Sequence, residues 1–207
     1  EKLEILDVGC GLGVFSKLLS EKGGKVTAID SSEEMINHAK MLCTGLSVNF
    51  IHQPFESFVP AQDETFDIIL GSFMLSYFED LTLVFSKISN ILSSTGICIM
   101  SMLHPLRLSS VRNETGVYSI VDYFDNNSIY ASDFLNNNEF LNLKKWTISD
   151  ITQSASESGL LVDLIKEPKP QNIPDRFINS KTSYLGKCPS VIIFKFVKNS
   201  SWRKQNL

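Results

Sequence analysis

A glycine-rich turn directly after the first apolar segment constrains this 207-residue chain more than any other feature. The segment Leu3–Val8 runs into Asp7-Val8-Gly9-Cys10-Gly11-Leu12-Gly13, in which glycine takes every second place from residue 9, and a helical pattern begins at Val14. Glycine tolerates positive φ and lets the backbone approach a ligand closely, while the first N–H groups of a helix have no partner within it. The turn predicts a strand, a bend and a helix in succession, with a nucleotide-like ligand at the bend.

The first hundred residues alternate short apolar runs with segments of helical period, which is typical of βαβ units and a parallel sheet. We therefore expect one α/β domain over residues 1–198, followed by a tail at 199–207. Its predicted strands are Leu3–Val8, Lys25–Ile29, Ser47–His52, Phe66–Leu70, Gly96–Met102, Leu160–Lys166 and Val191–Val197. Its predicted helices lie near Val14–Lys22, Ser32–Cys43, Leu81–Leu92 and Ile148–Ser158, the last opened by an approximate capping box of Thr147 with Asp150.

An acidic residue, Asp30, closes the second predicted strand, 17 residues past Gly13. A carboxylate in that place can accept hydrogen bonds from both ribose hydroxyls of an adenosine. The same residue could instead cap the following helix, but Ser31 with Glu34 forms the expected capping box there. We therefore expect Asp30 to be free for a ligand.

The spacing of the glycines separates two classes of nucleotide-binding protein. The dinucleotide fingerprint is G-x-G-x-x-G, whereas this chain has G-x-G-x-G, with Val14 where the third glycine would fall. The run Asp7–Gly13 resembles the first motif of class I S-adenosylmethionine-dependent methyltransferases, and Asp30 resembles their second acidic position. The resemblance extends to Phe66–Leu70 as their fourth strand and to Leu92–Gly96 as the turn into the fifth.

This resemblance implies an α/β, Rossmann-like, doubly wound fold with helices on both faces of a sheet. The sheet would have seven mostly parallel strands in the order 3-2-1-4-5-7-6, with the last strand antiparallel between the fifth and the sixth. The implied cofactor is S-adenosyl-L-methionine, with S-adenosylhomocysteine as product and no metal. The implied reaction is the transfer of a methyl group to a small-molecule acceptor by in-line displacement.

The resemblance also implies cofactor contacts by position. The glycine turn would hold the methionine end, and Asp30 would hold the ribose. After the third strand the family often places an acid beside the adenine, where this chain reads Gln53-Pro54-Phe55-Glu56. The expected cofactor contacts are Asp7, Gly9, Cys10, Gly11, Gly13, Asp30, Ser31, Met35, Phe55, Glu56, Ser72 and Phe73.

Two residues are candidates for catalysis. His104 precedes Pro105 at the end of the fifth strand, as in a subset of bacterial small-molecule methyltransferases, and it could remove a proton from the acceptor. Alternatively, hydrogen bonds fix His104 in place and it holds the neighbouring segment. Tyr77 could point into the pocket or pack in the core.

The alternation of strands and helices is interrupted at residues 104–146, which we expect to form an insertion on the substrate side. This segment is rich in aromatic residues, which would form either a lid over a hydrophobic or ring-bearing acceptor or ordinary loop packing. The residues concerned are Tyr118, Tyr123, Phe124, Tyr130 and Trp146.

The composition of the chain limits the kinds of partner that we expect it to bind. A net charge of −4 gives no long-range attraction to nucleic acid or anionic lipid, so a small molecule is the expected partner. The four cysteines lack metal-ligand spacing, and no apolar run approaches the roughly 18 to 20 residues of a membrane span. We expect a cytoplasmic protein, monomeric or homodimeric. Two other functions stay open: a scaffold of this fold that binds the cofactor without turnover, and a nicotinamide-dependent oxidoreductase.

Overall fold

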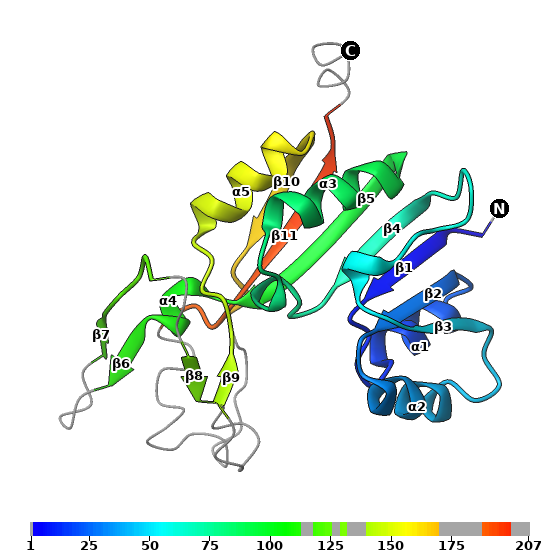
Figure 1. The fold of residues 1–207 in the computed structure, drawn as a ribbon, viewed down its shortest axis with the longest axis horizontal. Helices are drawn as coiled ribbons and strands as arrows, with labels where there is room; N and C mark the ends of the chain where they lie inside the picture. Colours follow the sequence, from blue (N-terminus) through cyan, green and yellow to red (C-terminus); the bar gives the residue numbers. More distant parts are fainter. Residues whose placement is uncertain (1, 113–117, 126–128, 132–139, 170–187, 200–207) are drawn as a thin grey trace.

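A seven-stranded sheet forms the centre of the computed structural model, which describes residues 2–112, 118–125, 129–131, 140–169 and 188–199. Its strands are β1 (Glu4–Val8), β2 (Lys25–Asp30), β3 (Val48–His52), β4 (Phe66–Gly71), β5 (Leu92–Leu103), β10 (Leu160–Lys166) and β11 (Val191–Lys198). The strand order is β10-β11-β5-β4-β1-β2-β3 (Figure 1). Strands β1 to β5 are parallel, and β11 is antiparallel to both β5 and β10. The predicted order, with the last strand antiparallel between the fifth and the sixth, is confirmed.

Helices cover both faces of this sheet. The four longer helices are α1 (Val14–Glu21), α2 (Glu33–Leu42), α3 (Leu81–Ile91) and α5 (Ile148–Glu157). Helices α3 and α5 pack together in front of the sheet in Figure 1, and α1 lies behind it, against β1, β2 and β3. The fold is therefore doubly wound, as predicted.

The core has two parts, one on each face, because successive side chains of a strand point to opposite faces. In β1, Leu6 and Val8 belong to the larger cluster under α3 and α5, whereas Ile5 belongs to the smaller cluster under α1 and α2. The apolar face of α3, formed by Leu81, Val84, Phe85 and Ile88, is buried in the larger cluster, where the ring of Phe85 meets that of Phe196 edge-on with centroids 5.0 Å apart. Truncating a buried phenylalanine of this kind to alanine typically costs about 3–5 kcal/mol of stability.

The start of β5 differs from the prediction. The strand begins at Leu92, directly after α3, instead of at Gly96. Leu92 is fully buried and pairs with Phe66, and the register with β4 shifts before Ile68 pairs with Ile97. The turn expected at residues 92–96 is thus a bulged first part of the strand, formed because burial of Leu92 draws the chain straight from the helix into the sheet.

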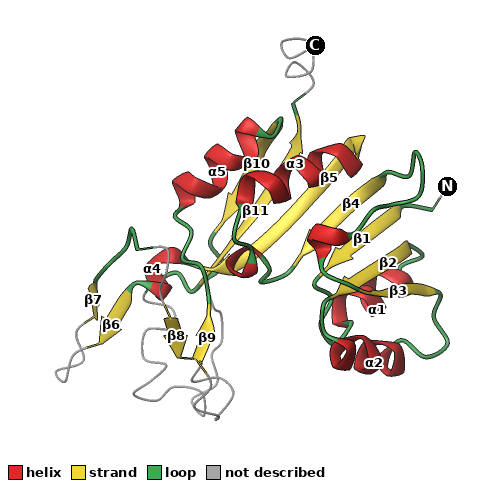
Figure 2. Cartoon of the chain, viewed as in Figure 1, coloured by secondary structure: helices red, strands yellow, loops and turns green. Residues whose placement is uncertain are grey.

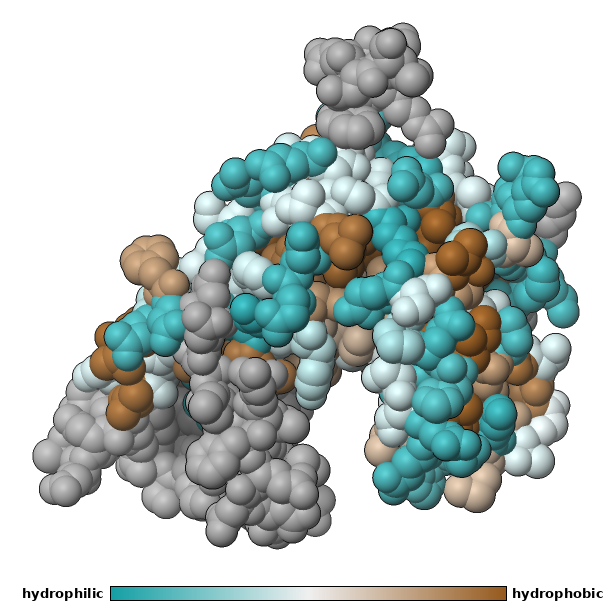
Figure 3. Space-filling view, in the orientation of Figure 1, coloured by the Kyte–Doolittle hydropathy of each residue, from teal (hydrophilic) through white to brown (hydrophobic). Residues whose placement is uncertain are grey.

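Residues 104–146 contain short elements that the sequence did not indicate: α4 (Pro105–Leu108) and two hairpins, β6 (Ser110–Arg112) with β7 (Tyr118–Ile120) and β8 (Ile129–Ala131) with β9 (Phe140–Asn142). Each of these strands has three residues, too few to show a period. They lie beyond the carboxyl end of β5 (Figure 2). The space-filling view shows a hollow beside α2, on the side of the carboxyl ends of the parallel strands (Figure 3).

Candidate active site

The glycine turn after β1 has the backbone conformation that its sequence predicts. Gly9 and Gly13 have φ values of 65° and 79°, in the left-handed region that disfavours other residues. Gly13 precedes α1, and a Cβ atom there would lie 2.8 Å from the Cβ of Ala39 on α2. The turn is therefore fixed both by its own conformation and by close packing of α2.

Asp7, at the end of β1, stabilises the glycine turn through a buried contact with α1. Its side chain is 1% exposed, and Oδ2 accepts a hydrogen bond of 2.6 Å from the hydroxyl of Ser16, which is also buried. Burial raises the pKa of Asp7 from 3.8 to about 6; the bond from Ser16 opposes this shift, and the charge of Asp30 adds to it. The role of Ser16 could not be predicted, because α1 also contains Lys17, Ser20 and Glu21 and only burial in the structure sets Ser16 apart from them.

Asp30 ends β2 and accepts two backbone hydrogen bonds. Its Oδ2 accepts from the N–H of Gly11 at 2.8 Å, and its Oδ1 accepts from the N–H of Ser32 at 2.9 Å. Asp30 therefore also holds the backbone of the turn and of the start of α2, while its contact with a ligand stays a prediction. The expected capping box was wrong, because Ser32, and not Ser31, caps α2 by accepting from the N–H of Met35 at 3.3 Å. Two lone-pair directions of the carboxylate remain for a ligand.

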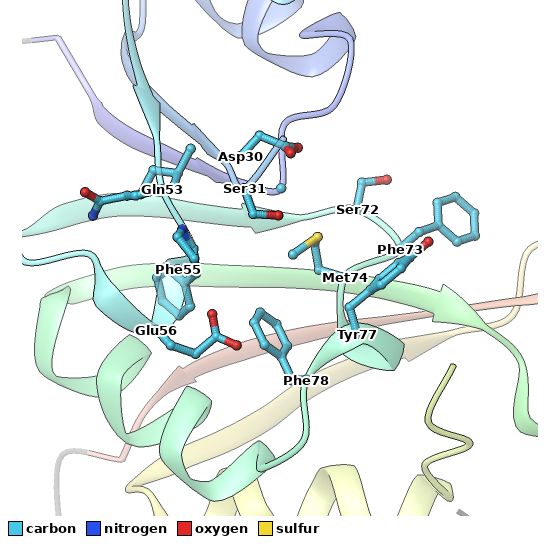
Figure 4. Close-up of a pocket in the computed structure, with 13 residues that line it drawn as sticks. Asp30, Ser31, Gln53, Phe55, Glu56, Ser72, Phe73, Met74, Tyr77 and Phe78 are labelled. Carbon is cyan, nitrogen blue, oxygen red and sulfur yellow. The ribbon is translucent and has the colours of Figure 1, made fainter. Parts of the chain in front are cut away.

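A cavity of about 580 Å³ lies at the carboxyl ends of β1, β2 and β4 (Figure 4). Eight of the residues expected in the site line it, and they come from four separate stretches of the chain. The lining residues are Gly9, Ile29, Asp30, Ser31, Gln53, Pro54, Phe55, Glu56, Ser72, Phe73, Met74, Tyr77 and Phe78. Expected site residues that do not line it are Asp7, Cys10, Gly11, Gly13, Met35 and His104.

The lining changes in character along the cavity. Gln53, Phe55 and Glu56 lie at one end, Phe73 and Tyr77 at the other, with Asp30 between them in Figure 4. A nucleoside fits the first part: an aromatic ring and an amide for a base, then a carboxylate for sugar hydroxyls. The sequence pattern predicted that Asp30 and Phe55 contact the ligand. It contained no signal that Gln53 would also face the ligand.

Met74 covers the glycine turn from inside the cavity. A Cβ atom built on Gly9 would lie 1.9 Å from the Sδ of Met74, so only glycine leaves room for this side chain. Met74 follows β4 and its side chain lies near the middle of the cavity in Figure 4. Because methionine is unbranched and adaptable, a ligand at Gly9 would contact the Met74 thioether.

Phe73 has a strained backbone. Its φ is 59°, which is uncommon for a bulky residue, and its N–H donates to the Ser101 hydroxyl at 3.2 Å. Its ring is 45% exposed and that of Tyr77 is 54% exposed. Both residues follow β4, Phe73 in the turn and Tyr77 in the short helix η2 (Leu75–Tyr77). Of the two alternatives for Tyr77, the structure favours the pocket, since the residue lies at the rim of the cavity and not in the core.

The opposite wall is a single helical turn, η1 (Phe55–Ser57), braced from outside by Lys87 of α3. The ammonium of Lys87 donates to the Glu56 carbonyl at 2.7 Å and lies 5.4 Å from the centroid of the Phe55 ring. Partial burial lowers the pKa of Lys87, and the charge of Glu56 opposes this. Phe55 itself is 3% exposed, so the wall is held by packing as well as by this contact.

His104 lies outside the cavity. It is buried, its Nε2 is 2.8 Å from the Glu167 carboxylate, and its Nδ1 accepts from the N–H of Leu106 at 3.1 Å. Burial lowers the pKa of His104, and the bond to Glu167 opposes this. With both ring nitrogens engaged, His104 caps α4 and ties the segment after β5 to the chain beyond β10. The structure thus favours the positional role of His104 over that of a base.

The aromatic residues expected in a lid do not line the cavity where the structure describes them. Tyr123 and Phe124 pack edge-on with centroids 5.1 Å apart, and Trp146 packs against the larger core cluster. The side chains of Tyr118 and Tyr130 lie outside the described part of the chain. The described side chains therefore fit ordinary packing better than a lid.

Within residues 2–112, 118–125, 129–131, 140–169 and 188–199, no group of three or more metal-ligating side chains occurs. In the same ranges, no helix has the length and apolar character needed to cross a bilayer.

Known proteins are similar to this chain in sequence around the glycine turn and in the fold of the domain. Residues 6–100 match the family model described as Methyltransferase domain. An uncharacterised Haemophilus influenzae protein is 36% identical over 109 residues, which are 50% of this chain and 43% of that protein. The ubiquinone biosynthesis O-methyltransferase of Colwellia psychrerythraea is 34% identical over 104 residues, 49% of this chain and 42% of the enzyme. The matched part of the chain thus spans less than half of the length of these relatives.

Solved structures match over a larger share of the chain. A Listeria monocytogenes protein assigned to the S-adenosylmethionine-dependent methyltransferases has a TM-score of 0.78 and 25% identity, covering 96% of this chain and 90% of its own. The S-adenosylmethionine-dependent methyltransferase of Mesorhizobium loti has a TM-score of 0.77 and 20% identity, and the match covers 94% of this chain and 90% of the Mesorhizobium chain. Sheet order, glycine turn and these matches agree: the chain has the fold of the class I S-adenosylmethionine-dependent methyltransferases, and its residues 6–100 are similar to the methyltransferase domain family.

Proposed function

We propose that this protein transfers the methyl group of S-adenosylmethionine to a small-molecule acceptor. The observation that carries the proposal is the order of groups along one cavity: a site for a base at Phe55, a carboxylate for a sugar at Asp30, backbone at Gly9, and an aromatic rim at Phe73 and Tyr77. This is the order in which adenine, ribose, sulfonium and acceptor must follow one another.

Positioning is the main task that such a reaction leaves to the protein. Bound S-adenosylmethionine supplies a methyl group on a good leaving group. The residues of this chain then need to hold the donor at Gly9 and Asp30, keep water out with Met74 and Phe78, and align the acceptor at the rim. No base is required when the acceptor loses its proton readily, so the position of His104 away from the cavity is compatible with turnover.

Oxygen is the acceptor atom that we propose. Several relatives of this chain are named ubiquinone biosynthesis O-methyltransferases, including one from Xanthomonas euvesicatoria that matches over 77% of this chain at 27% identity. The buried residues Cys10, Cys43 and Cys98 are thiols, which supports a reducing compartment such as the cytoplasm. We also propose that the segment at residues 104–146, which follows the carboxyl end of β5, lies on the substrate side of the domain.

The experiment is a turnover assay with a panel of small hydroxylated acceptors. The full chain is incubated with S-adenosylmethionine, and S-adenosylhomocysteine and the methylated product are measured by mass spectrometry. We expect both to form in equal amounts with at least one acceptor. Tight binding of the donor without product would support a scaffold instead, and binding of NAD in place of the donor would support an oxidoreductase.

A further inference from the structure

We propose that Phe73 and Tyr77 form a subsite for the ring of a planar aromatic acceptor, an inference that rests on the proposed methyl transfer. Both residues line the cavity at the end opposite Gln53 and Glu56. In Figure 4 their side chains point away from Asp30. The part of the cavity that remains when a nucleoside occupies the other end is therefore bounded by two aromatic rings.

The exposure of these rings is the first support. Phe73 is 45% exposed and Tyr77 is 54% exposed, although both stand beside a deep hydrophobic core. Among the residues that the structure describes, neither ring packs against another aromatic ring. Their faces are thus available to a ligand, and aromatic rings bind other rings in offset-stacked or edge-to-face arrangements.

The backbone of Phe73 is the second support. A phenylalanine with φ of 59° is held against its conformational preference, and the hydrogen bond from its N–H to Ser101 is one contact that keeps it there. Strained residues of this kind cluster at functional sites. Here the strain places an apolar ring at the cavity rim, where packing of the protein alone gives it little to contact.

The charges of the residues that line the cavity also support a planar aromatic acceptor. The 13 lining residues include two acids, Asp30 and Glu56, and no lysine, arginine or histidine. A charged phosphate or carboxylate on the acceptor would find no cation among them. Contact with the two rings is then the main source of affinity, which favours an uncharged aromatic compound.

The test compares two probes of similar size in binding to the full chain saturated with S-adenosylhomocysteine. The first probe is 2-naphthol, which is planar, and the second is decahydro-2-naphthol, its saturated counterpart. Calorimetry should give a Kd for 2-naphthol about tenfold lower than for the saturated compound, because only the planar ring can stack. Phe73→Leu and Tyr77→Leu should each raise the Kd for 2-naphthol about fivefold to tenfold, and Tyr77→Phe should leave it within about twofold.

Phe15→Leu is the matched control. Phe15 is a phenylalanine of α1 that is 43% exposed and does not line the cavity, so its replacement should not change either Kd. Because Phe73, Tyr77 and Phe15 are all exposed, unfolding of the variants is not expected, and melting temperatures check this.

Two different failures can be told apart. If S-adenosylhomocysteine itself does not bind, the proposed function fails. If it binds but the two probes bind equally, or if the leucine variants bind 2-naphthol as the natural protein does, the aromatic subsite is wrong while the proposed methyl transfer stands.

Discussion

At the scale of single residues, Asp30 combines two tasks. Its carboxylate accepts backbone hydrogen bonds from Gly11 and Ser32, so it joins the glycine turn to the start of α2. The same group faces the cavity, where lone pairs remain for a ligand. A substitution at this position would therefore affect both the turn and the ligand. The sequence indicated only the second task, because side chain to backbone contacts across 19 residues leave no pattern in a sequence.

Asp7 gives a prediction on the pH dependence of stability. Its pKa in the folded protein is about 6, above the 3.8 of an exposed aspartate, so folding favours the protonated form. This contribution to stability is complete below about pH 3.8 and is lost as the pH rises through 6, by about 3 kcal/mol in total. Relative to Asp7→Asn, the natural protein should lose most of that amount, about 2 kcal/mol, between pH 4 and pH 7.

The measurement is the free energy of unfolding by urea for both proteins across this range. The asparagine variant serves as the reference, because an amide can still accept from Ser16 and does not titrate. Curves that stay parallel from pH 4 to pH 7 would show that Asp7 has an ordinary pKa.

At the scale of elements, most of the fold could be predicted from the sequence. Strands β1 to β4, β10 and β11 and the four longer helices lie within one or two residues of their predicted bounds, because their apolar periods are regular. No pattern of residues indicated η1, η2 or the short elements of residues 104–146, which are too short to have a period. Helices η1 and η2 contribute Phe55, Glu56 and Tyr77 to the cavity wall, so the site was predicted less completely than the fold.

Helix η1 gives a prediction about positioning. Lys87→Met keeps the length of the side chain but removes the hydrogen bond to the Glu56 carbonyl and the cation beside Phe55. We expect the Kd for S-adenosylhomocysteine to rise about threefold to tenfold, since a bond from a charged donor is lost from a partly exposed site. Calorimetry measures this, and Lys87→Arg should restore most of the affinity.

Lys195→Met is the control for this prediction. Lys195 pairs with Asp163 at the far edge of the sheet and does not line the cavity, so the same substitution there should leave the Kd unchanged. A Lys87→Met variant that binds as tightly as the natural protein would rule out a positioning role for Lys87.

At the scale of the whole molecule, the sheet order places all parts of the site. Strands β1, β2 and β4 are neighbours, so the turns that follow them meet at one edge although they are far apart in the sequence. Strand β5 lies between β4 and β11 in the sheet. The segment at residues 104–146 follows β5 and therefore begins at the edge formed by the carboxyl ends of the parallel strands (Figure 1). This arrangement followed from the family resemblance, since periodicity alone does not fix the order of strands.

The most direct test of the account is a calorimetric titration of S-adenosylhomocysteine into the natural protein, Asp30→Asn and the distant control Asp163→Asn. We predict that the natural protein and the control bind with the same Kd and that Asp30→Asn binds about 30-fold more weakly, a loss of about 2 kcal/mol. Adenosine should show a similar loss, whereas 2′,3′-dideoxyadenosine, which lacks the ribose hydroxyls, should show almost none. Equal affinity of all three proteins for S-adenosylhomocysteine, or an equal loss for both nucleosides, would contradict the assignment of Asp30 to the ribose.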